Sequence, residues 1–136
     1  IMSIADLHPM VIHFPIALLT MAVLFDGAGI FLKNVSLLHA GEWNLNLGLL
    51  FAIAGIITGT IADRDFGHMD SPFPILTTHG SLQILSIVGF AGLWIWRKKI
   101  EASLFTSGRL YFFSGIILIA VLYYGSHLGI LLSGRI

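Results

Sequence analysis

Residues 10–32 read MVIHFPIALLTMAVLFDGAGIFL, and Asp26 is the only residue in this run with a formal charge. A helix of about 20 predominantly apolar residues crosses the ~30 Å hydrocarbon layer of a bilayer. Three further apolar runs follow, at about Trp43–Ala62, Thr78–Trp96 and Leu110–Leu132. The pattern predicts an all-α integral membrane protein, a four-helix up-down bundle in which residues 1–136 form one four-span domain.

The composition narrows the class of protein. Hydrophobic residues make up 57% of the chain and charged residues 10%, and the mean hydropathy is +0.93. Soluble domains average about 25% charged residues. The net charge of zero gives no basic surface for nucleic acid, and the absence of cysteine excludes disulfides, covalently attached haem and all-cysteine iron–sulfur sites.

The basic residues predict the orientation in the membrane. The expected connections are Lys33–Glu42, Asp63–Thr77 and Arg97–Arg109. The first and third of these carry most of the lysine and arginine, which marks a cytoplasmic side. We therefore expect a bacterial inner-membrane protein with both termini on the periplasmic side.

The histidines gather on the expected outer side. His8 and His13 lie at the start of the first span, His79 opens the third, and His127 lies near the end of the fourth. His68 falls in the outer loop, and only His39 is on the cytoplasmic side. Ionisable groups at membrane depth usually line a site. We expect His13, His79, His127 and His8 to bind a cofactor, although interfacial histidines bonded to water, carbonyls or headgroups would give the same pattern.

Small and polar residues accompany the histidines. Gln83 and Ser86 follow His79 at helical spacing and are expected to orient a ligand ring. Four glycines give either close helix contact or room for a flat ring: Gly55, Gly59, Gly125 and Gly129. Plain helix packing explains the same glycines, and interhelical hydrogen bonds explain the same polar residues.

Two polar features lie near the expected cytoplasmic side. Asp26 is interpreted either as part of a proton path or as a hydrogen-bond partner of Asn44 or Asn46. The run Arg97-Lys98-Lys99 is interpreted as a topology signal with some attraction to anionic lipid.

The order of motifs resembles the bacterial membrane-protein family known as domain of unknown function 2231. The resemblance rests on His8-Pro9, the run from Ile12 to Leu18, Gly59–Asp63, His79-Gly80 and the run from Tyr123 to His127. It covers nearly the whole chain, with Gln83 in place of an expected asparagine and a mostly aliphatic C-terminal tail. It implies the fold and the importance of the motif histidines, and it implies no reaction.

The function predicted from these observations is that of a small b-type cytochrome-like protein. Haem b would be held by two of His13, His79 and His127, with His13–His79 as the first pairing to test. The expected partners are membrane lipid and a neighbouring redox subunit or periplasmic electron carrier. The alternatives are a cofactor-free accessory subunit of a larger membrane complex and a copper, zinc or iron site formed by the same histidines. No catalytic motif is present, so the chain is at most a redox subunit of an enzyme.

Overall fold

The computed structural model describes residues 11, 13–66 and 79–132. Its elements are α2 (His13–Leu32), α3 (Val35–Phe66), α4 (His79–Ile100), the short 3-10 helix η2 (Glu101–Ser103) and α5 (Leu104–Leu132). Every described residue except Lys33 and Asn34 is helical. The prediction of an all-α chain is confirmed.

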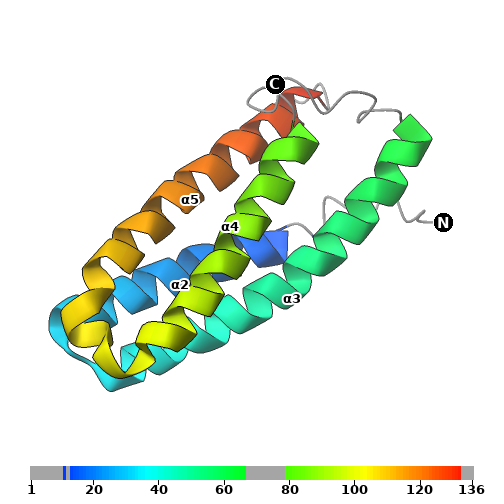
Figure 1. Ribbon diagram of the computed structural model, residues 1–136. Coiled ribbons are helices and arrows are strands. Elements are labelled where there is room, and N and C mark those ends of the chain that lie inside the picture. The colour runs from blue at the N-terminus through cyan, green and yellow to red at the C-terminus, as the bar shows by residue number, and fades with distance from the viewer. Residues whose placement is uncertain (1–10, 12, 67–78, 133–136) are drawn as a thin grey trace.

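The long helices run side by side, and successive helices point in opposite directions (Figure 1). Three described stretches are long and apolar enough to cross a membrane, judged by length and composition: His13–Leu32, Val35–Gly59 and Gly80–His127. The third has 48 residues and takes in α4, η2 and α5, so the predicted count of four spans is not confirmed.

The helix boundaries differ from those predicted at both short connections. α3 begins at Val35 rather than near Trp43, because Asn34 caps it: its Oδ1 accepts the backbone N–H of Leu37 at 3.1 Å. α2 ends with Lys33 at a φ of 52° and with the Asn34 N–H bonded to the Gly29 carbonyl at 2.9 Å. This is the hydrogen bond of a Schellman C-cap, and it reduces the connection to two residues.

At the other connection, α4 continues to Ile100 and η2 leads directly into α5 at Leu104. The prediction of a loop from Arg97 to Arg109 is therefore wrong. Both tight connections lie at the same end of the bundle (Figure 1). We call this the turn end, and we call the opposite end, where α2 and α4 begin with histidine, the histidine end.

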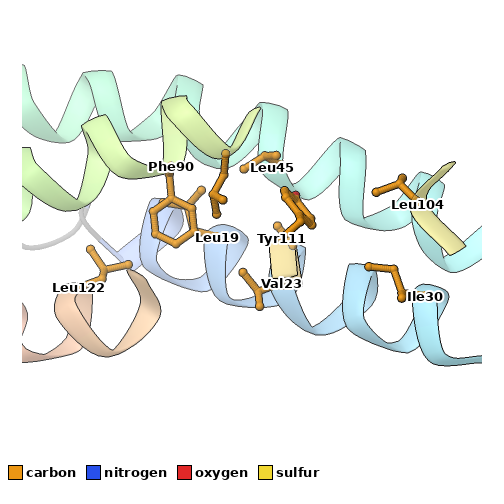
Figure 2. Close-up of a cluster of buried hydrophobic side chains, with 10 residues drawn as sticks. Leu19, Val23, Ile30, Leu45, Phe90, Leu104, Tyr111 and Leu122 are labelled. Carbon is orange, nitrogen blue, oxygen red and sulfur yellow. The ribbon is translucent and has the colours of Figure 1, made fainter. Parts of the chain in front are cut away.

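The core follows the middle of the bundle. Figure 2 shows Leu19 and Val23 of α2 facing Phe90 of α4 and Leu122 of α5. α3 packs mainly on α2 and much less on α4. Burial of these apolar side chains keeps α2, α4 and α5 in a fixed register, which sets the relative heights of the polar residues at both ends.

Candidate functional site

A buried ion pair lies near the turn end. The Arg97 Nε donates to Asp26 Oδ2 at 3.0 Å, and the Arg97 Nη2 donates to Asp26 Oδ1 at 3.0 Å. The two side chains are 2% and 1% exposed. Two parallel charge-assisted bonds are the strongest geometry open to an arginine and a carboxylate, and charges so deep in an apolar protein need such pairing.

Every long helix contributes to this ion pair. Tyr111 of α5 donates its hydroxyl to Asp26 Oδ2 at 2.9 Å, and Arg97 Nη2 also donates to the Leu38 carbonyl of α3 at 2.7 Å. Glu42 of α3 accepts from Arg97 Nη1 at 3.4 Å and from Lys98 Nζ at 2.8 Å. We call Asp26, Glu42, Arg97, Lys98 and Tyr111 the turn-end cluster.

The close approach of α3 is possible because position 41 is glycine. A Cβ at Gly41 would collide with the Asp26 carboxylate. The absence of a side chain there lets α3 lie against the ion pair and supply the Leu38 carbonyl and the Glu42 carboxylate.

The chemistry of the turn-end cluster is structural. Both Asp26 oxygens accept hydrogen bonds from Arg97, and Oδ2 accepts a further one from Tyr111. An arginine side chain keeps its proton in proteins. The arrangement therefore holds the four long helices together. A cavity of about 180 Å³ lies beside it, lined in part by His39, Glu42, Arg97 and Glu101.

The structure corrects two interpretations made for this region. Asp26 does not bond Asn44 or Asn46: Asn44 donates to the Ala40 carbonyl, and Asn46 accepts the indole N–H of Trp94 at 2.8 Å. Arg97 is not a plain topology signal, because it is buried and paired with Asp26.

A signal for Arg97 was present in the helical register. The buried positions of α4 are Leu82, Ser86, Phe90, Leu93 and Arg97. Their spacing of three and four residues is that of one helix face, and Lys98 and Lys99 fall off it. Register therefore separates the one inward arginine from two outward lysines.

At the histidine end, close contacts fix the relative height of α2 and α5. A Cβ at Gly115 of α5 would lie 3.0 Å from Val23 of α2. His13 lies ten residues beyond Val23 toward the histidine end, and His127 lies twelve residues beyond Gly115. At a rise of 1.5 Å per residue these are distances of about 15 and 18 Å, so the two histidines differ in depth by about 3 Å.

α4 is placed by a similar contact with α5. Gln83 Nε2 donates to Ser126 Oγ at 3.0 Å. His79 begins α4 one turn beyond Gln83, whereas His127 follows Ser126 directly. His79 therefore lies about 4–5 Å further toward the end of the bundle than His127. Three helices thus carry a histidine within about 8 Å of one another along the bundle.

The exposure of the histidines differs from an interior haem site. The side chains of His13 and His127 are exposed on the bundle surface, as is that of His39 at the turn end. Among the described residues, no group of three or more His, Asp or Glu is arranged to hold a metal ion.

Ser86 and Gln83, the two polar residues expected to orient a ligand, differ in their hydrogen bonds. Ser86 is fully buried and donates to the Leu82 carbonyl of its own helix at 2.8 Å. Gln83 has a buried Oε1 without a hydrogen-bond partner. The Ser126 hydroxyl donates to the Leu122 carbonyl, so it accepts from Gln83 Nε2, and this fixes the amide with Oε1 toward Gly125.

The glycines divide into close contacts and open space. A Cβ at Gly125 would lie 2.8 Å from Gln83 Oε1 and 3.1 Å from Leu82 Cβ, so glycine lets α5 lie close to α4 here. Gly55 is buried, yet no described atom lies within 4 Å of the place that its Cβ would occupy. Gly59 is partly buried. Helix packing therefore explains Gly125, while Gly55 borders unfilled space.

Some predicted site residues fall outside the described part of the chain. His8 and His68 lie in the segments without a described structure. His79 and Gly129 belong to α4 and α5, and their surroundings are likewise outside the description.

Comparison with known proteins identifies the family. The model of the family described as "Predicted membrane protein (DUF2231)" matches residues 5–136, so the chain belongs to this family. The predicted family is confirmed, and its description agrees with the apolar helices. No curated protein and no solved structure matches the chain significantly.

Proposed function

We propose that this member of the DUF2231 family is a small membrane electron-transfer subunit that binds haem b at the histidine end. The observation that carries the proposal is that His13, His79 and His127 lie on three different helices at the same end of the bundle. Haem iron in b-type cytochromes is held by side chains such as imidazole, and helix bundles commonly provide them from facing helices.

The residues present fit such a group. His13 and His127 have exposed rings that the core does not use. Gln83 leaves a buried acceptor free close by, and buried polar atoms without partners are rare in native proteins. Both of these histidines lie near the edge of an apolar run: His13 is three residues after the start of residues 10–32, and His127 is five residues before the end of residues 110–132. Haem carries one electron at a time, and propionates at this edge would reach water.

The proposed subunit exchanges electrons with a neighbouring membrane redox subunit or a periplasmic carrier. The inner membrane and the periplasmic position of the histidine end belong to this proposal.

The test is an optical spectrum of protein isolated gently from its native membrane and reduced with dithionite. We expect a Soret band and the sharp visible bands of six-coordinate haem b. His39→Ala is the control, since His39 lies at the turn end and its replacement leaves the spectrum unchanged. Protein without haem absorbance refutes the proposal and supports a cofactor-free accessory subunit instead.

A further inference from the structure

We propose that His13 and His127 form a two-histidine metal site across the outside of the seam between α2 and α5, and that His79 is not its second ligand. The metal is a first-row transition ion that binds imidazole, either haem iron or a bare ion such as Zn²⁺ or Cu²⁺. Where that iron belongs to haem, the proposal rests on the function proposed above and assigns its ligands.

The seam is marked by a hydrogen bond between the two helices. Thr20 Oγ1 of α2 and the Tyr123 hydroxyl of α5 lie 2.9 Å apart, and this contact is exposed. Both side chains therefore reach the outside of the bundle at the line where α2 meets α5. Their positions therefore identify the face of α2 and the face of α5 that border the exposed side of this seam.

Both histidines share a helix face with this contact. His13 precedes Thr20 by seven residues, and His127 follows Tyr123 by four. Residues four or seven apart lie on one side of an α-helix. His13 and His127 are therefore on opposite flanks of the same seam, beyond the Thr20–Tyr123 contact toward the histidine end.

The depth of the two residues matches. The register set by Val23 and Gly115 places His13 and His127 about 3 Å apart along the bundle. Helices in contact are about 8–10 Å apart from axis to axis. Two imidazoles, one from each helix and each about 2 Å from a shared ion, can bridge this distance between the helix axes.

The pairing of His13 with His127 replaces the expected first pairing of His13 with His79, because His13 and His127 flank one seam and both side chains are exposed.

The experiment compares His13→Ala, His127→Ala and His79→Ala in purified full-length protein. Haem is read by absorbance, and zinc and copper are read by elemental analysis and by titration of metal-depleted protein. We expect the first two replacements to weaken metal binding by more than about 100-fold, since even an outer partner of a ligand contributes about 10–100-fold. His79→Ala is expected to retain binding.

A proximity test keeps the proposal independent of any loss of folding. The chain has no cysteine, so His13→Cys with His127→Cys introduces the only two thiols. A short thiol-specific bifunctional reagent should join them within one chain. The matched control is His39→Cys with His127→Cys, at opposite ends of the bundle, which should not be joined.

Each outcome decides something different. Haem that survives His127→Ala but not His79→Ala overturns the pairing and leaves the haem function standing. Zinc or copper lost on replacing His13 or His127, in protein without haem, keeps the site and refutes the haem function. No metal of any kind, or failure of the 13–127 thiols to join, overturns the site.

Discussion

Arg97 and Asp26 are 71 positions apart in the chain and meet through two parallel 3.0 Å hydrogen bonds in the interior. Their pairing joins α4 to α2, and Tyr111 and the Leu38 carbonyl bring in α5 and α3. This ion pair therefore lies where the four long helices converge.

Asp26→Asn should destabilise the protein strongly, because it leaves a buried guanidinium without its counter-charge. Removal of one partner of a buried ion pair costs about 3–5 kcal/mol. Thermal unfolding in detergent measures the loss. Lys98→Met, which removes an exposed partner of Glu42, is the control and should change little.

The double variant Asp26→Leu with Arg97→Met should be more stable than either single variant. Well-packed apolar residues commonly replace a buried pair without loss, and residues in direct contact do not behave additively. If the two losses simply add, the ion pair is not the unit that holds the helices.

Gly41→Ala should destabilise the bundle, because its Cβ would collide with the Asp26 carboxylate. Gly55→Ala is the matched control on the same helix, where no described atom stands in the way. Alanine favours a helix over glycine by up to about 1 kcal/mol, so Gly55→Ala should be neutral or stabilising. Equal losses at both positions would contradict the packing of α3.

Tyr111→Phe should cost about 1.5–3 kcal/mol, the range for a hydrogen bond to a charged group. Phenylalanine keeps the ring that meets Trp96 edge to face, so the effect isolates the hydroxyl. Tyr124→Phe, at an exposed position, should leave the melting temperature unchanged. A loss of the same size there would mean that tyrosine replacement is harmful in general.

Reporter fusions at Ser103 and Ile136 test the orientation. The excess of lysine and arginine at the turn end predicts a cytoplasmic reporter at Ser103 and a periplasmic one at Ile136. The reverse pattern would place the histidine end in the cytoplasm and would require a different electron-transfer partner.

The sequence was sufficient to predict the presence and order of the long helices, but not their boundaries at the two short connections or the contacts between them. Long apolar runs reveal each helix, because a chain in lipid satisfies its backbone bonds internally. The Asp26–Arg97 pair was missed because Arg97 was interpreted together with its basic run, although its helical spacing from Phe90 and Leu93 places it on the buried face of α4. The sequence alone does not show that the face of α2 that carries His13 borders α5. The Thr20–Tyr123 contact shows it.

The turn-end ion pair also divides the protein into two interdependent halves. Asp26 belongs to the first pair of helices and Arg97 to the second. The first hairpin alone contains the Asp26 carboxylate without the guanidinium that pairs with it. A chain interrupted between the hairpins would therefore lack the partner that a buried carboxylate needs. Completion of the ion pair thus distinguishes a finished molecule from a fragment.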